Sequence, residues 1–149
     1  MAKIRLTKEF HYEMSHVLWN YEGLCSNIHG HSYTLFVTIV GEPIKDKNNP
    51  KLGMVIDFGD LKKIVKEVII DMLDHAFVVS KDAPTDLLKQ VPQMFHKMVV
   101  VDYQPTCENM IIDFASRIEK KLPKYVRLFS LKLHETPTSF AEWYADDNK

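Results

Sequence analysis

The chain has 149 residues, a length typical of one domain with its own hydrophobic core. Its composition, 46% hydrophobic and 26% charged, is that of an average globular protein, and a formal net charge of −1 argues against a nucleic-acid or membrane surface built on bulk charge. No apolar run approaches the roughly 20 residues of a membrane span, and the N-terminus is charged where a signal peptide would be apolar, so we expect a cytoplasmic protein with a single domain over residues 1–149.

Two strands are expected in the first third of the chain. Residues 33–40, YTLFVTIV, are β-branched or aromatic and contain no breaker, which is typical of a strand. Residues 41–53 are polar, rich in turn residues and without a regular period, so we expect an irregular connection there. Near the N-terminus, apolar residues of one parity indicate a half-buried strand. They are Ile4, Leu6, Phe10, Tyr12 and Met14.

Two amphipathic helices are expected further along the chain. Residues 59–75 carry apolar residues at three-and-four spacing, with charged residues on the opposite face. Residues 106–123 show a second apolar stripe of the same period. Thr106 is the expected N-cap of this second helix, and the helix should end before Pro123.

Three more strands complete the predicted elements. Residues 97–103 indicate a short strand between the helices, whereas residues 80–96 are expected to form a loop with at most one helical turn. Residues 125–133 and 139–144 indicate two strands that are joined by the turn HETPT. With strands at both ends and helices between them, the order predicts an α+β domain, an antiparallel sheet with two helices packed on one face.

Three histidines could form a metal site. His29 and His31 lie at or before the start of a strand, where residues two apart point to the same side. The pair is either two zinc ligands or two partly exposed turn residues. His16 shares the inward parity of the first strand and could complete the set from a neighbouring strand roughly 5 Å away; otherwise it is a satisfied half-buried histidine. Three imidazoles would leave a fourth zinc position open, as catalytic sites do.

The two cysteines need separate interpretations, because a structural disulfide is not expected in a reducing compartment. Cys25 lies four residues before His29. It is a fourth zinc ligand, a thiolate that accepts a proton beside the metal, or a buried inert residue. Cys107 falls in the first turn of the second helix, and we interpret it as an inert buried thiol.

Four acidic or imidazole groups are candidates for acid–base chemistry and binding. Asp74 directly precedes His75, and the two side chains can bond each other if the helix ends there. A carboxylate bonded to an imidazole raises the basicity of the imidazole. The alternative is that the two residues simply cap the helix. Glu135 shares the parity of the apolar residues before it, and its carboxylate could accept two parallel N–H bonds from an amino-pyrimidinone ring. Glu108 fits a first helical turn through the helix dipole alone.

Six motifs in this order resemble the 6-pyruvoyltetrahydropterin synthase family. They are FHYEMSH, CSNIHGHSY, GMVIDFGDLK, LDH, QPTCEN and HETPTS, and they span nearly the whole chain. Three residues separate Cys25 from His29, as in the bacterial 6-carboxytetrahydropterin synthases of queuosine precursor synthesis; the pyruvoyl-forming animal enzymes usually have a longer gap. A folate-linked subgroup has Glu at the position of Cys25. Residues 76–105 look longer than in compact bacterial members.

The resemblance implies a zinc enzyme with the tunnelling fold (T-fold), in which small antiparallel sheets join around a channel. It implies a homohexamer of two trimers with active sites at subunit interfaces, so that the Asp–His pair need not meet Cys25 within one chain. The implied zinc ligands are His16, His29 and His31. The implied catalytic residues are Cys25 as general base and Asp74 with His75 as a proton relay. The implied pterin-binding residues are Glu135, Thr106 and Glu108.

The implied reaction converts 7,8-dihydroneopterin triphosphate to 6-carboxy-5,6,7,8-tetrahydropterin, with loss of triphosphate and acetaldehyde. The alternatives are the pyruvoyl-forming activity, which eliminates triphosphate only, and a binding protein that keeps zinc and pterin without turnover. A protein with a purely structural zinc site is a less favoured alternative, because such a site usually fills all four ligand positions with protein side chains.

Overall fold

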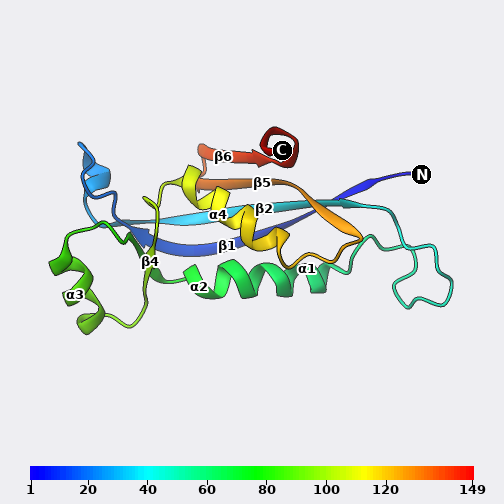
Figure 1. The fold of residues 1–149 in the computed structure, drawn as a ribbon, viewed down its shortest axis with the longest axis horizontal. Coiled ribbons are helices and arrows are strands. Elements are labelled where there is room, and N and C mark those ends of the chain that lie inside the picture. Colours follow the sequence, from blue (N-terminus) through cyan, green and yellow to red (C-terminus); the bar gives the residue numbers. More distant parts are fainter.

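The computed structural model describes residues 1–149, apart from the side chain of Leu24. Six strands form one sheet in the order β4-β3-β1-β2-β5-β6, and the long strands extend along the molecule (Figure 1). The strands are β1 (Ile4–His16), β2 (His29–Gly41), β3 (Ala76–Ser80), β4 (Met98–Val101), β5 (Val126–Thr136) and β6 (Ser139–Tyr144).

The centre of the sheet is the hairpin formed by β1 and β2. The two strands pair antiparallel over their whole length, from Ile4 opposite Gly41 to His16 opposite His29. β5 and β6 continue the antiparallel pairing on the β2 side. On the other side, β3 pairs parallel with the end of β1, and β4 pairs parallel with β3. The sheet is therefore mostly antiparallel, with two short parallel strands beside the end of β1.

The two predicted amphipathic helices are present. The first is continuous from Phe58 to Leu73 and has an N-cap at Asp57, whose Oδ1 accepts the Gly59 N–H at 2.6 Å. It comprises α1 (Phe58–Val65), a π-helical segment (Lys66–Ile70) and α2 (Asp71–Leu73). The second is α4 (Cys107–Glu119). No helix in the described part of the chain is long and apolar enough to cross a membrane.

Both helices pack on the same face of the sheet, as predicted (Figure 1). Alternate strand residues point into this helix-covered face, and helix residues at three-and-four spacing meet them. The shared core includes Tyr12, Tyr33, Leu35, Val37, Leu61, Val65, Ile69, Phe114, Ile118 and Leu131. The opposite face, here called the outer face, is more polar around the hairpin: Thr7 bonds Thr38, and Ser32 donates to Glu13 at 2.6 Å.

The segment between the two helices differs from its prediction. Residues 80–96 were expected to be mostly loop, but α3 (Thr85–Met94) runs for ten residues there. The helix has no buried residue and contains Pro92, which weakened the helical pattern of the sequence. β3 was not predicted, because a five-residue apolar run does not distinguish a strand from a continuing helix. The predicted strand at residues 97–103 is confirmed as β4.

Candidate metal centre and its surroundings

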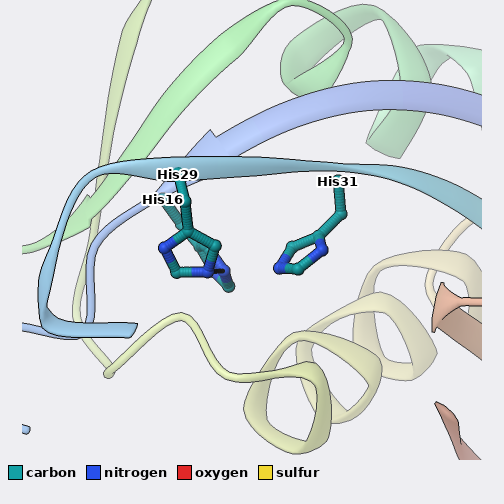
Figure 2. Close-up of side chains that lie close together, drawn as sticks. All are labelled: His16, His29 and His31. Carbon is teal, nitrogen blue, oxygen red and sulfur yellow. Dashed lines mark hydrogen bonds between the residues drawn. The ribbon is translucent and has the colours of Figure 1, made fainter. Parts of the chain in front are cut away.

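Three histidine side chains converge at the end of the hairpin (Figure 2). His16 is the last residue of β1 and lies opposite His29, the first residue of β2, while His31 follows two positions later on the same side. One ligand nitrogen from each ring lies within 4.8 Å of the others. His16 is 1% exposed, and the other two are half-buried. The register of one hairpin therefore places all three imidazoles as a shared ligand set requires.

Backbone carbonyls fix the orientation of two of these rings. His16 donates its Nδ1 hydrogen to the carbonyl of Pro105 at 2.8 Å, and His29 donates its Nδ1 hydrogen to the carbonyl of Asn27 at 2.8 Å. A carbonyl can only accept, so the Nε2 atom of each neutral ring carries a lone pair. The two Nε2 atoms lie 3.0 Å apart. Two lone pairs therefore face each other across a short distance.

This donor set fits a zinc-sized cation. Tetrahedral zinc with Zn–N bonds of about 2.0–2.1 Å separates neighbouring ligand nitrogens by about 3.3 Å. The third nitrogen, Nε2 of His31, is buried and makes no hydrogen bond among the described residues. A cation between the three nitrogens would satisfy this orphaned atom and remove the repulsion between the two facing lone pairs.

Burial keeps the rings in the form that binds metal. Burial, with smaller contributions from the neighbouring His29 and His31, lowers the pKa of His16 to about 4, against the opposing effect of its bond to Pro105. Burial also lowers the pKa of His31, although the Glu135 carboxylate opposes this shift. Neutral imidazoles are metal ligands, whereas imidazolium ions are not.

The segment that orients His16 is itself fixed at the start of α4. Thr106 is the N-cap, as predicted, and its Oγ1 accepts the Asn109 N–H at 3.2 Å. The Asn109 side chain donates to the carbonyl of Gln104 at 3.1 Å, and the Gln104 side chain donates to the carbonyl of Trp19 at 3.0 Å. Sequence reasoning missed the role of the Pro105 carbonyl, since no side-chain pattern reports a backbone acceptor 89 residues from its donor.

The candidate binding carboxylate lies beside the histidines. Oε1 of Glu135 is 3.2 Å from Nε2 of His31, without the geometry of a hydrogen bond, and its side chain is 26% exposed. The predicted inward parity of Glu135 therefore brings it to the cluster. Thr106 is half-buried at the start of α4, and Glu108 is exposed in its first turn. Neither is joined to the histidines by an interaction among the described residues.

Cys25 lies near the strand ends but outside the histidine group. It is half-buried on a short 3₁₀ helix, Leu24–Ser26, and its carbonyl accepts the Leu18 N–H at 3.0 Å. This bond ties the residue to the chain just after β1. Among the described residues, the ligand atoms within 4.8 Å of one another come from histidines alone. The structure therefore gives no support to Cys25 as a fourth ligand within one chain, and its role as a base stays a prediction.

Cys107 has the environment of an inert thiol. Its Sγ donates to the carbonyl of Leu133 at 3.3 Å. Burial and the Glu135 carboxylate raise the pKa of the thiol to about 11. A thiol that stays protonated at neutral pH is a poor nucleophile, which agrees with its interpretation from the sequence.

Asp74 and His75 form a contact pair at the end of α2. The helix ends at Leu73, and His75 adopts a positive φ of 62°, so the pair can meet: Nδ1 of His75 lies 3.1 Å from Oδ1 of Asp74. The same oxygen accepts the Glu13 N–H at 2.9 Å, and the His75 N–H donates to the Glu13 carbonyl at 2.6 Å. The Glu13 amide, followed by His75, holds the pKa of Asp74 below its ordinary value.

The structure does not bring this pair to the histidine group. His75 lines a hollow of about 360 Å³ together with Glu13, Ser15 and Ser32, whose side chains belong to the outer face of the hairpin. His31 also borders this hollow, but its position on β2 has the inward parity of the buried Tyr33. The side chain of His75 is 77% exposed. Within one chain, the pair and the three histidines therefore lie on opposite faces of the sheet.

The chain has close counterparts among known proteins. It is 37% identical over 141 residues to the 6-carboxy-5,6,7,8-tetrahydropterin synthase of Haemophilus influenzae, with 93% of this chain and 97% of that protein covered. It is 32% identical over 142 residues to the protein of the same name from Rickettsia typhi, with 93% and 99% covered.

Solved structures show the same fold. A protein of Wolinella succinogenes superposes with a TM-score of 0.80 at 21% identity, covering 97% of this chain and 99% of that chain. The 6-pyruvoyl tetrahydropterin synthase of Caenorhabditis elegans superposes with a TM-score of 0.68 at 24% identity, covering 97% of both chains. These likenesses confirm the α+β tunnelling fold that was predicted from the sequence.

The model of one protein family covers nearly the whole chain. Residues 5–146 match the family described as 6-pyruvoyl tetrahydropterin synthase. The matched range includes both strands of the central hairpin, α4 and Glu135. The chain therefore belongs to the 6-pyruvoyl tetrahydropterin synthase family.

Proposed function

We propose that this protein is a zinc-dependent lyase that converts 7,8-dihydroneopterin triphosphate and water to 6-carboxy-5,6,7,8-tetrahydropterin, acetaldehyde and triphosphate, as a step of queuosine precursor synthesis. The observation that carries the proposal is the convergence of three imidazoles beside Glu135. This arrangement puts a metal ligand set next to a carboxylate that can hold an amino-pyrimidinone ring. The names of the most similar relatives support the carboxy-forming product.

His16, His29 and His31 would hold the zinc ion through Nε2. The carbonyls of Pro105 and Asn27 support this role, because they orient two of the rings and fix their tautomers. A zinc ion with three protein ligands keeps one position for substrate and acts as a Lewis acid on the hydroxyl groups of the substrate side chain.

Glu135 would anchor the pterin ring. A carboxylate accepts two parallel hydrogen bonds from the ring N–H and the adjacent amino group, which fixes the ring in one plane. Oε1 lies 3.2 Å from Nε2 of His31, so a ring bound to this carboxylate would lie beside the metal ligands. The Thr106 hydroxyl, which accepts the Asn109 N–H, still has its own hydrogen to donate. Glu108 completes the proposed set from the first turn of α4.

Cys25 would act as the general base, and the Asp74–His75 pair would relay protons between the substrate side chain and the ring. The hydrogen gained by the ring comes from the substrate's own side chain, so the reaction needs no nicotinamide. His75 lies beside Glu13, Ser15 and Ser32, whose strand positions have the opposite parity to those of the three histidines. A complete site would therefore combine the metal centre of one chain with the pair of another, as a homohexamer of two trimers provides.

Product analysis tests the function. Zinc-loaded protein is incubated with 7,8-dihydroneopterin triphosphate, and the products are identified by mass spectrometry. The expected products are the 6-carboxy compound, acetaldehyde and triphosphate. A 6-pyruvoyl product without acetaldehyde would assign the sister activity, in which the carbon–carbon bond is kept.

The variant Cys25→Ala separates an enzyme from a binding protein. An enzyme loses turnover while its zinc content stays at the wild-type level. Unchanged substrate with wild-type protein and bound zinc would overturn the proposal and leave a pterin- or zinc-binding protein.

A further inference from the structure

Two buried tyrosines follow the histidines along the helix-covered face of the hairpin. Tyr12 and Tyr33 are paired directly across β1 and β2, and their rings stack at 5.0 Å with an interplanar angle of 4°. They are 2% and 1% exposed. The Tyr33 ring lies 5.7 Å from the ring of His31 and 6.3 Å from that of His16, while Tyr12 meets Phe114 of α4 edge-on.

The hydroxyl groups of both tyrosines lack a hydrogen-bond partner among the described residues. Burying an unpaired hydroxyl costs about 1–3 kcal/mol, and a buried tyrosine hydroxyl usually has a partner. A packed core would be served as well by phenylalanine at either position. Two adjacent, unpaired hydroxyls beside a ligand site therefore point to a polar partner within that site.

Glu135 is the acceptor that needs these donors. The pairing of β2 with β5 reaches Thr34 opposite His134, so the next position of the register places Tyr33 beside Glu135. Tyr12 lies on the other side of Tyr33 in the same cross-strand row. The carboxylate contacts Nε2 of His31 at 3.2 Å. An Nε2 atom that binds a metal carries no hydrogen to donate, so Glu135 would need other donors in the loaded protein.

We propose that Tyr12 and Tyr33 are positioning residues that hold the Glu135 carboxylate by hydrogen bonds, directly or through one ordered water, in the orientation that binds the pterin ring. This inference rests on the proposed function. The lone pairs of a carboxylate are enough for two ring N–H groups and two tyrosine hydroxyls. The tyrosines would thus act on the ring through Glu135 without touching it.

The test removes each hydroxyl and keeps each ring. Zinc-loaded Tyr12→Phe, Tyr33→Phe and the double variant are titrated with 7,8-dihydroneopterin, which lacks the triphosphate. Each single change is expected to weaken binding about five- to tenfold, with one zinc per chain retained. In a Glu135→Gln background the further loss should fall below about twofold, because the hydroxyls act through the carboxylate.

A matched control carries the same chemical change elsewhere. The Tyr103 hydroxyl donates to Asp113 at 2.6 Å, so Tyr103→Phe should lower stability without weakening the binding of 7,8-dihydroneopterin. Wild-type affinity in Tyr12→Phe and Tyr33→Phe would overturn the inference, and so would an equal loss in the Glu135→Gln background. If the wild-type protein itself fails to bind this pterin, the pterin site of the proposed function fails as well, and the two failures are thus distinguished.

Discussion

Nε2 of His16 lies 3.0 Å from Nε2 of His29, although both rings already donate their Nδ1 hydrogens to backbone carbonyls. When both rings are neutral, neither Nε2 carries a hydrogen to donate to the other. The fold thus holds two lone pairs together, and packing and the register of the hairpin must offset their repulsion. A cation that accepts both lone pairs converts this repulsion into binding energy.

Removal of metal should therefore lower stability. At a free zinc concentration of about 100 times Kd, binding adds about 2.7 kcal/mol to the free energy of unfolding, which raises Tm by about 5–10 °C for a chain of this length. We expect one zinc per chain and loss of this increment on chelation. Thermal unfolding with and without zinc, together with metal analysis, measures both.

The variant His29→Ala should abolish stoichiometric zinc binding and the thermal shift. His11→Ala is the control, because His11 is exposed and bonds Thr34 on the outer face. A His29→Ala protein that still binds one zinc per chain with wild-type affinity would contradict the assigned ligand set.

Loss of the N-cap of α4 should weaken zinc binding as well as lower stability. Thr106→Ala removes the acceptor of the Asn109 N–H and is expected to cost about 1 kcal/mol of stability. Because Thr106 follows the carbonyl that orients His16, the same change should also weaken zinc binding. Urea unfolding and zinc titration measure the two effects, and Thr106→Ser, which keeps the acceptor, should restore both. Wild-type zinc affinity in Thr106→Ala would separate the cap from the metal centre.

The Asp74 carboxylate should make stability depend on pH in the acid range. The Glu13 amide and His75 lower its folded-state pKa below the ordinary value of 3.8. Its contribution is therefore fully present above pH 3.8 and is lost as pH falls through the lower folded-state pKa. Asp74→Asn should be less stable than wild type above about pH 5, and the difference should vanish in stronger acid.

Urea unfolding over this range of pH checks the Asp74 prediction. The control is Asp102→Asn, which removes the charge of an exposed carboxylate and shows how much any such loss changes the free energy of unfolding. A difference between wild type and Asp74→Asn that persists unchanged in strong acid would show that lost packing, and not lost charge, causes it.

The two thiols should differ in reactivity. With a pKa of about 11, Cys107 is a thiolate for only about one part in a thousand near pH 8, and its hydrogen is bonded to Leu133. Iodoacetamide should therefore modify Cys25 well before Cys107, as peptide mass spectrometry would show. The Cys25→Ala protein should react only slowly. Equal rates at the two cysteines would refute the inert assignment of Cys107.

Much of the centre of the molecule could be predicted from local patterns. The alternation of β1 placed His16 inward, the spacing of His29 and His31 placed them on one side, and the stripes of α1 and α4 gave the helix-covered face. These features depend on a period of two or of 3.6 within one element. The same parity brought Glu135 to His31.

Features that depend on two distant segments could not be predicted in this way. The Asp74–His75 pair faces the outer side because His75 takes a left-handed backbone conformation between a helix and a parallel strand, which no period encodes. α3 is amphipathic, but it contains Pro92 and has no fully buried residue, and its Leu87 and Leu88 pack only against a small cluster separate from the main core. Tyr12 and Tyr33 appeared as ordinary core residues, and their only signal was inward parity beside a metal ligand.

The hydrogen bond between His16 and Pro105 also has a consequence for folding. All three candidate ligands come from one local hairpin, which can form early because its contacts are short in sequence. The carbonyl that orients His16 lies 89 residues away and arrives only when the segment before α4 docks. A nascent hairpin thus has the three nitrogens, and Asn27 can already orient His29, but the final tautomer of His16 waits for this docking. Tight metal capture therefore coincides with completion of the domain.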